Sequence, residues 1–198
     1  MTHFSNGEVE VFSYQRTKAG NEHCGDGYYY TGTEDYFICV LADGLGSGKN
    51  AYDSATAVKA IVEQYHYEDV DSIMNRCNEG LSQKRGAAVA ILKVHFLKKE
   101  FVYSCVGNIR FFLYSSSGKL TYPVPVTGYL SGKPQHFRTQ CFPYESASKF
   151  LLYSDGFHFN GLKSKLSTLK PLKSVAEDIK QTPIFSSDDA TFIIGSLL

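Results

Sequence analysis

The 198-residue chain has no net charge and no extended apolar segment, and both absences exclude classes of protein. Lysine and arginine together number 20, and so do aspartate and glutamate. A nucleic-acid-binding protein usually carries a basic excess on at least one segment, and none stands out here, so we expect no nucleic-acid partner. The longest apolar runs are far too short to cross a bilayer, so we expect no membrane partner either.

The sequence also lacks a targeting segment and a paired-cysteine motif. Its first residues, MTHFSNGEVEVF, contain neither the basic region nor the apolar region of a signal peptide. The cysteines are odd in number, widely spaced and free of any C-x-x-C; they are Cys24, Cys39, Cys77, Cys105 and Cys141. This pattern indicates reduced thiols in a cytoplasm, and we expect each thiol to be buried for structural reasons.

No Pro-, Gly- or Ser-rich linker and no internal repeat interrupts the chain, so its length predicts one domain over residues 1–198. Predicted strands cover 8–14, 28–31, 36–42, 87–96, 100–106, 109–114, 120–122, 149–154 and 191–198. Predicted helices cover 49–66, 69–83, 162–166 and 174–181, and residues 123–140 form a predicted loop. Strands in adjacent groups, with two long helices in tandem, argue against an alternating parallel fold. They favour an α+β fold of antiparallel sheets flanked by helices.

The segment VLADGLGSGKNA, residues 40–51, ends an apolar run at an aspartate and then adds three glycines. It fails the Walker phosphate loop, because Asp43 occupies the place of the first glycine and Asn50 that of the Ser or Thr. It also fails the dinucleotide-binding pattern, since Lys49 replaces the third glycine. A hairpin turn at Asp43 and Gly44 is the plainer interpretation, but a helical pattern follows instead of a second strand.

Four acidic sites lie where predicted strands begin or end: Asp26, Asp43, Asp155 and the pair Asp188 and Asp189. A single Asp-Gly is more often a solvated turn than a ligand, but four such sites can meet at one rim of a sheet assembly. Carboxylates brought together repel one another unless a cation lies among them. Ligands that are all oxygens suit Mg²⁺ or Mn²⁺ and argue against zinc. The pattern therefore predicts a metal site, and two cations bridged by a carboxylate can activate water for attack on phosphorus.

Six motifs, in order, resemble those of the metal-dependent serine/threonine phosphatases of the PP2C (PPM) type. They are CGDGYYY, VLADGLGSGKNA, KRGAAVAIL, CVGNIRFFLY, LLYSDGF and DDATFIIG, and together they extend over nearly the whole chain. The resemblance implies an α-β-β-α sandwich, two packed antiparallel sheets with helix pairs outside. The small size and the segments ADGLGSG, KRGA and GYLSGKPQ are most similar to the stressosome-associated branch of this family.

The resemblance also implies a role for each of five residues. Asp43 would bridge two Mn²⁺ or Mg²⁺ ions, and the carbonyl of Gly44 would bind the second ion. Asp155 and Asp188 would bind the first ion. Asp26 would hold the second ion directly or through water. The four aspartates are accordingly the predicted catalytic residues.

Two positions depart from the eukaryotic pattern of the family. Asn21 stands where the phosphate-binding arginine belongs, and Gly25 replaces a glutamate that precedes the first aspartate. Phosphate binding must then depend on the metals or on another cation. Lys84, Arg85 and Arg110 are candidates, although a solvated or structural charge is the plainer interpretation of each.

The resemblance implies a phosphatase acting on phosphoserine and phosphothreonine of stressosome scaffold (STAS-domain) proteins, which would reset the general stress response. We expect the enzyme to be cytoplasmic, from its cysteines and the lack of a targeting segment, and to be a monomer. Two alternatives stay open. One is a non-catalytic member of the fold that binds phosphoproteins, and the other is a hydrolase of a small phosphoester. The intact aspartates favour the enzyme over the first alternative, whereas substrate choice depends on loops and leaves the second open.

Overall fold

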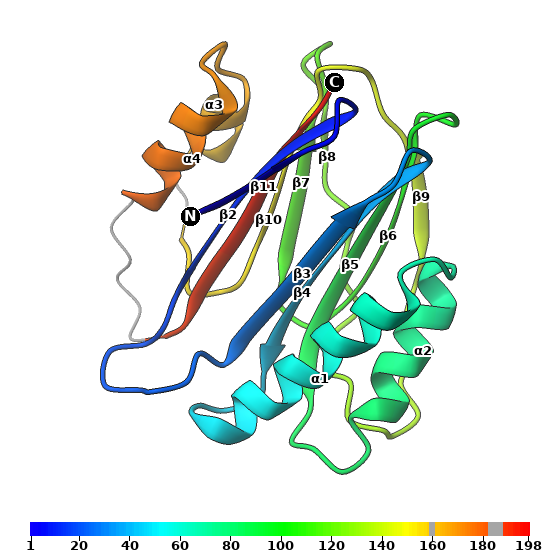
Figure 1. Cartoon of the computed structure of the whole chain (residues 1–198), viewed down its shortest axis with the longest axis vertical. Coiled ribbons are helices and arrows are strands. Elements are labelled where there is room, and N and C mark those ends of the chain that lie inside the picture. Colours follow the sequence, from blue (N-terminus) through cyan, green and yellow to red (C-terminus); the bar gives the residue numbers. More distant parts are fainter. Residues whose placement is uncertain (159–160, 182–187) are drawn as a thin grey trace.

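Two antiparallel sheets pack face to face between two pairs of helices in the computed structural model, which describes residues 1–158, 161–181 and 188–198 (Figure 1). The six-stranded sheet contains, in spatial order, β1 (Thr2–Ser5), β2 (Val9–Arg16), β11 (Ala190–Leu197), β10 (Lys149–Tyr153), β7 (Arg110–Tyr114) and β8 (Leu120–Thr121). The five-stranded sheet contains β3 (Asp26–Gly32), β4 (Tyr36–Gly44), β5 (Ala87–His95), β6 (Glu100–Val106) and β9 (Gln140–Pro143). The predicted α-β-β-α sandwich is confirmed.

Three apolar layers hold the sandwich together. One layer lies between the two sheets. A second lies between the five-stranded sheet and the helices α1 (Lys49–Tyr65) and α2 (Val70–Gly80). A third lies between the six-stranded sheet and the helices α3 (Leu162–Leu166) and α4 (Leu172–Lys180). Each sheet is therefore buried on both faces.

Burial on both faces explains why the central strands are continuous apolar runs. In β4 the side chains of Cys39 and Leu41 enter the layer between the sheets, while Val40 and Ala42 enter the layer below α1 and α2. Successive residues of a strand point to opposite faces, so both sets must be apolar. The same alternation directs Asp43, at the end of β4, toward the space between the sheets.

The predicted elements agree with the structure apart from their ends and two short strands. Sequence patterns missed β1, whose residues are mostly exposed, and β9, which begins at the end of the predicted 123–140 loop. Both strands are only four residues long, and neither has the buried apolar pattern on which strand prediction depends. None of the helices in the described ranges is long and apolar enough to cross a membrane.

All five cysteines are free thiols, but their environments differ. Cys39, Cys77 and Cys105 are buried in the apolar layers, as expected. Cys24 is half-buried and Cys141 is exposed. The expectation of burial is therefore wrong for Cys141, because it lies on β9 at the edge of the five-stranded sheet.

Candidate metal centre

Asp26 and Asp43 lie directly opposite each other where the paired strands β3 and β4 meet the rim of the sandwich. The Gly44 N–H donates to the Gly25 carbonyl at 3.0 Å, so that pair is hydrogen-bonded and the next pair, Asp26 with Asp43, is not. Side chains of such non-hydrogen-bonded pairs are the closest across an antiparallel ladder. Asp26 is only 4% exposed and Asp43 is half-buried. Two strands thus bring two carboxylates together on the face between the sheets.

The six-stranded sheet contributes the other acidic residues. Its neighbouring strands β10 and β11 pair Tyr153 with Phe192. Asp155 follows the end of β10 and Asp188 precedes the start of β11, so both residues lie at the same end of this strand pair. Both are exposed.

Asp26, Asp43 and Asp155 each have a raised pKa, and nearby carboxylates contribute to each shift. Burial, followed by the charges of the neighbouring aspartates, raises the pKa of Asp43 to about 8; those neighbours are Asp26, Asp155, Asp188 and Asp189. Burial also raises the pKa of Asp26 to about 7, against the lowering effect of hydrogen bonds from Thr191 and Ser154. The pKa of Asp155, whose carboxyl is partly desolvated although the residue is exposed, is raised by that desolvation and by the charge of Asp188. A cation among these carboxylates would relieve the repulsion.

The backbone carbonyl of Gly44 is buried without a hydrogen-bond donor among the residues that the structure describes. Its N–H pairs with Gly25, so its carbonyl points toward the same neighbour. The Gly25 N–H, however, donates to the Asp189 carboxylate at 2.7 Å. A buried carbonyl left unpaired costs free energy unless it finds another partner, and a hard cation is such a partner.

Gly44 must also be a glycine for steric reasons. A Cβ at this position would lie 2.0 Å from the backbone oxygen of Ala51 in α1. The absent side chain thus lets the first turns of α1 approach the end of β4. The glycine after Asp43 is therefore required by the packing of α1, in addition to the predicted role of its carbonyl as a metal ligand.

Asp189 has a structural role that the motif alone does not reveal. One of its carboxylate oxygens accepts the Lys18 N–H at 2.8 Å and the other accepts the Gly25 N–H at 2.7 Å. A Cβ at Gly25 would lie 2.8 Å from this carboxylate. The glycine that replaces the family's glutamate therefore belongs to the arrangement in which Asp189 holds the 18–25 loop against the rim.

Two further polar residues orient the aspartates. The Ser154 hydroxyl donates to Asp26 Oδ2 at 2.7 Å and accepts the Thr191 N–H at 2.9 Å. Asn108 Nδ2 donates to Asp155 Oδ2 at 2.7 Å. Sequence reasoning assigned neither residue a role. Two features of the sequence could have pointed to them: Ser154 ends the apolar run FLLYS just before Asp155, and Asn108 is the asparagine of CVGN.

The donor set fits a hard cation, although the side chains do not form a closed cage. Its groups are carboxylates and one carbonyl, the oxygens that Mg²⁺ and Mn²⁺ prefer. In the described part of the chain, no group of three or more His, Cys, Asp or Glu side chains is arranged to hold a metal ion. One oxygen of Asp188 accepts the N–H of Asp189 at 2.9 Å. The ligand set of Asp26, Asp43, Gly44, Asp155 and Asp188 stays a prediction.

The candidate phosphate-binding cations lie in different places. The Arg85 guanidinium packs beside Gly46, with Nη1 3.1 Å from the position of a Cβ there. Arg110 interacts with the hydroxyl of Tyr153, and Lys84 is exposed. Asn21 stands in the place of the family's arginine. Its side-chain nitrogen Nδ2 is buried and has no hydrogen-bond partner among the described residues.

Comparison with known proteins identifies the relatives of this chain. The family model for Stage II sporulation protein E (SpoIIE) matches residues 33–194. The phosphoserine phosphatase RsbX of Bacillus subtilis (strain 168) is 41% identical over 192 residues, which are 97% of this chain and 96% of the relative. The crystal structure of RsbX in complex with magnesium covers 100% of this chain and 99% of its own, with a TM-score of 0.94 and 40% identity.

A more distant structure agrees in fold. It contains the PP2C phosphatase domain and a fragment of the regulatory domain of SpoIIE from Bacillus subtilis, and has a TM-score of 0.78 at 15% identity over 95% of this chain and 62% of its own. At that identity the likeness concerns the fold alone. The resemblance drawn from six motifs is confirmed, and the chain belongs to the SpoIIE family, whose phosphatase domain has the PP2C fold.

Proposed function

We propose that the protein is a phosphatase dependent on Mn²⁺ or Mg²⁺ that hydrolyses phosphoserine and phosphothreonine on protein partners. The observation that carries the proposal is the buried carbonyl of Gly44, unpaired by the described residues and adjacent to Asp43 in a group of mutually repelling carboxylates. This arrangement is costly for a merely structural rim and favourable for a cation site. The similarity to a phosphoserine phosphatase over nearly the full chain supports the same activity.

Each predicted ligand has a defined place in this proposal. Asp43 would be shared between two ions, with the Gly44 carbonyl on the second and Asp155 and Asp188 on the first. Asp26 would contact the second ion directly or through water. When bound, a pair of such cations lowers the pKa of a water molecule and orients it for in-line attack on phosphorus.

The chain's own residues prepare the site for this chemistry. Ser154 keeps the Asp26 carboxylate in one orientation, and Asn108 does the same for Asp155. Asp189 holds the loop before β3 in place by accepting two backbone N–H groups. Groups held by such hydrogen bonds lose little freedom on binding a cation, which favours a well-defined ligand geometry.

The proposed substrates are phosphorylated STAS-domain scaffold proteins of the stressosome, on which a monomeric, cytoplasmic enzyme would act. This choice depends on the similarity of ADGLGSG, KRGA and GYLSGKPQ to the stressosome-associated branch and on the similarity to RsbX. The exposed positions of Asp155 and Asp188 suit short Ser and Thr stems on a folded partner.

The test is incubation of a phosphorylated STAS-domain scaffold protein with the enzyme and Mn²⁺, followed by intact mass spectrometry. We expect the mass of the scaffold to fall by one phosphoryl group for each phosphorylated Ser or Thr, with phosphotyrosine left in place. If the scaffold keeps its phosphate while a sugar phosphate or nucleotide is consumed, the small-phosphoester alternative is correct. If neither changes but the phosphorylated scaffold binds, the protein is a non-catalytic binding module.

A further inference from the structure

The strand β3 is an edge strand of the five-stranded sheet, and the backbone N–H and carbonyl groups of every second residue point away from its only neighbour among the described strands, β4. Hydrogen bonds at its two ends, from Gly44 N–H to Gly25 and from Thr33 N–H to Tyr36, set the phase of its pairing with β4. Odd-numbered residues of β3 therefore pair with β4, and the backbone groups of even-numbered residues point away from it. The outward carbonyl of Asp26 accepts a hydrogen bond from Gln15 at 2.9 Å.

The next outward backbone groups belong to Tyr28 and Tyr30. Within the described residues, no group forms a hydrogen bond with the outward N–H or carbonyl of either one. Their side chains, in contrast, have partners, since both hydroxyls lie within hydrogen-bond distance of the Thr2 hydroxyl. The edge thus combines fixed side chains with backbone donors and acceptors at every second residue.

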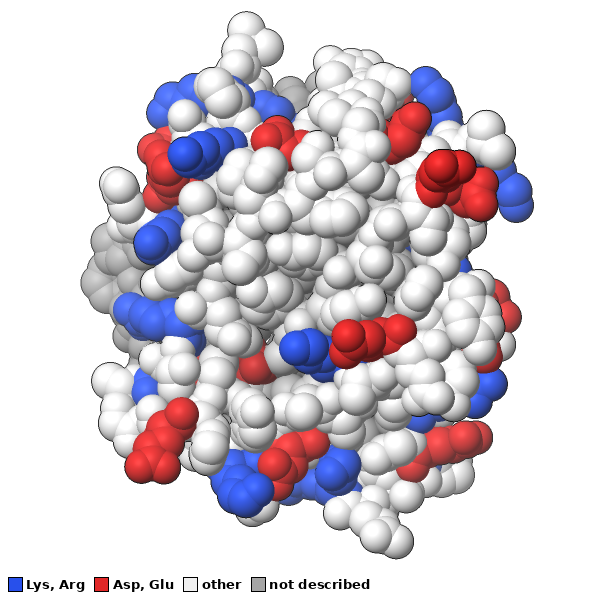
Figure 2. Space-filling view, in the orientation of Figure 1, with Lys and Arg blue, Asp and Glu red and all other residues white. Residues whose placement is uncertain are grey.

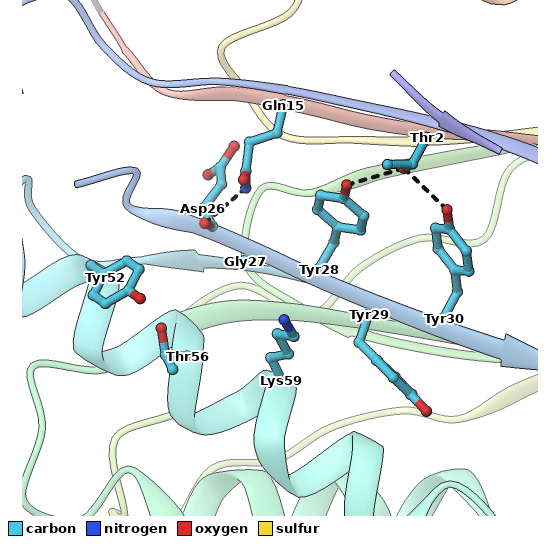
Figure 3. A pocket seen from close by; sticks show the side chains of 10 residues that line it. All are labelled: Thr2, Gln15, Asp26, Gly27, Tyr28, Tyr29, Tyr30, Tyr52, Thr56 and Lys59. Atoms are coloured by element: carbon cyan, nitrogen blue, oxygen red, sulfur yellow. Dashed lines mark hydrogen bonds between the residues drawn. The ribbon is translucent and has the colours of Figure 1, made fainter. Parts of the chain in front are cut away.

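A cavity of about 430 Å³ extends along this edge (Figure 3). The strand β3 runs along it between two walls. On one side are Thr2 and Gln15 of the six-stranded sheet, and on the other are Tyr52, Thr56 and Lys59, which α1 presents at helical spacing. We call this cavity the β3 groove. These walls flank the edge of β3 on both sides, a geometry that suits a single extended chain more than a whole sheet.

The β3 groove begins at the candidate metal centre. Asp26 lines it at one end, and the only other charged residue among those that line it is Lys59. Figure 2, in the orientation of Figure 1, shows an uncharged surface at and above the centre, with a basic and an acidic side chain just below it and the other charged side chains around the margins. A groove of hydroxyls and aromatic rings beside unpaired backbone groups is suited to a polypeptide backbone more than to a charged ligand.

Exposed edge strands are usually protected by lysine, proline or a bulge, because they otherwise pair with other chains. The β3 sequence DGYYYTG contains neither lysine nor proline. On the basis of the proposed phosphatase function, we propose that the β3 groove binds the extended segment of the substrate protein that flanks the phosphorylated Ser or Thr. The segment pairs with the backbone of Tyr28 and Tyr30 and places the phosphorylated residue at Asp26.

Blocking the groove from α1 tests its occupancy without altering β3 or any predicted ligand. Thr56→Trp fills the groove, and Gln64→Trp, an exposed position on α1 outside the groove lining, is the matched control. For Thr56→Trp we expect kcat/KM on a phosphoserine peptide of about a dozen residues to fall about tenfold or more, equivalent to losing one or two hydrogen bonds. Hydrolysis of p-nitrophenyl phosphate should be unchanged, and Gln64→Trp should retain both activities.

Backbone pairing is tested by the peptide itself. Two versions are N-methylated at alternate residues in opposite phases, so that only one version loses the amides that face β3. We expect one phase to be hydrolysed as well as the unmodified peptide and the other about tenfold more slowly, as strand pairing uses every second amide. Equal hydrolysis of the two phases would overturn the proposal.

Other outcomes separate this proposal from the proposed function. Loss of p-nitrophenyl phosphate hydrolysis in Thr56→Trp would show damage to the site and contradict a separate groove. If wild-type enzyme hydrolyses neither p-nitrophenyl phosphate nor the peptide with Mn²⁺ present, the phosphatase function itself fails. If wild-type protein is a dimer that Thr56→Trp dissociates, the groove is occupied by a second copy of the chain and the substrate assignment is wrong.

Discussion

Asp26 and Asp43 face each other across the antiparallel pair of β3 and β4, as a non-hydrogen-bonded pair at the rim between the two sheets. Cα atoms in such pairs are about 4.5 Å apart. The strand pairing therefore holds the two carboxylates at a distance where their negative charges repel each other. A buried and a half-buried acid in this relation are favoured as neutral groups or as ligands of a cation. The raised pKa values of both residues mean that, without a cation, the neutral form of each carboxyl is favoured over a wider pH range than usual.

The first prediction concerns the bridging residue. Asp43→Asn should lower activity about 100-fold or more. Mutation of residues that only orient metal ligands already lowers metal affinity or activity about 10- to 100-fold, and Asp43 is a predicted ligand itself. Calorimetric titration with Mn²⁺ measures the site directly, and Asp155→Asn and Asp188→Asn should also weaken binding. Binding like that of the wild type in Asp43→Asn would disprove the bridging assignment.

The second prediction is the pH dependence of the metal-free protein. The folded-state pKa values of Asp26 and Asp43 lie near 7 and 8, well above the ordinary value of 3.8. The folded state therefore binds these protons more tightly, and the free energy of unfolding should decrease as pH rises from about 4 to about 8. Urea unfolding in EDTA measures this slope.

Asp43→Asn provides the control for the pH slope. It should be more stable than wild type at pH 8 without metal, because one unfavourable charge is gone, and its slope should be shallower. Saturating Mn²⁺ should stabilise the wild type most at high pH, where the ligands are deprotonated. Identical slopes for the two proteins in EDTA would show that Asp43 does not titrate in this interval.

The third prediction concerns Ser154. Ser154→Ala removes the donor to Asp26 and leaves the buried Thr191 N–H without its acceptor. We expect a loss of about 1–3 kcal/mol in the free energy of unfolding and about 10- to 100-fold weaker Mn²⁺ binding. Thermal unfolding and calorimetry measure the two effects. Ser167→Ala, an exposed serine of the same type, should change neither.

The fourth prediction separates the two proposed ions. Asp26→Asn should lower turnover while occupancy of the first ion, held by Asp155 and Asp188, stays largely intact. Mn²⁺ titration followed by calorimetry should then show one retained site. Unchanged turnover at saturating Mn²⁺ would mean that Asp26 is only a structural residue at the start of β3.

The fifth prediction concerns the 123–140 loop as a determinant of the protein substrate. Leu130 pairs with Ala87, which in turn pairs with Gly44, so the loop lies one strand away from the proposed ligand. Asn78 holds it by accepting the N–H groups of Ser131 and Gly132.

Shortening the loop beyond Leu130, which is buried, should lower activity on a phosphoprotein and preserve hydrolysis of a small aryl phosphate. Loops of this length are usually functional or mobile, and a substrate role depends on contact with the partner. Equal losses on both substrates would indicate a fold defect, and no loss on either would leave the loop as a plain connection.

Antiparallel sheets flanked by helices, with aspartates at the strand ends, were predictable from local patterns, whereas the α-β-β-α sandwich followed from the resemblance to the PP2C family. Continuous apolar runs indicate that β4 and β10 are buried on both faces. The aspartates at the ends of these runs are therefore expected at the rim of the sheets. The role of Asp189 was not predictable, since it depends on the conformation of the distant 18–25 loop. The β3 groove follows from the order of strands in the sheet, which a single sequence does not contain.

The most direct test of the account is phosphate release from a phosphoserine protein by the wild-type enzyme, measured with and without Mn²⁺. We predict release only with the metal, loss of release in EDTA, recovery when Mn²⁺ is restored, and almost none from Asp43→Asn under any condition. Release that is equally fast in EDTA, or undiminished in Asp43→Asn, would contradict a metal centre built on these carboxylates.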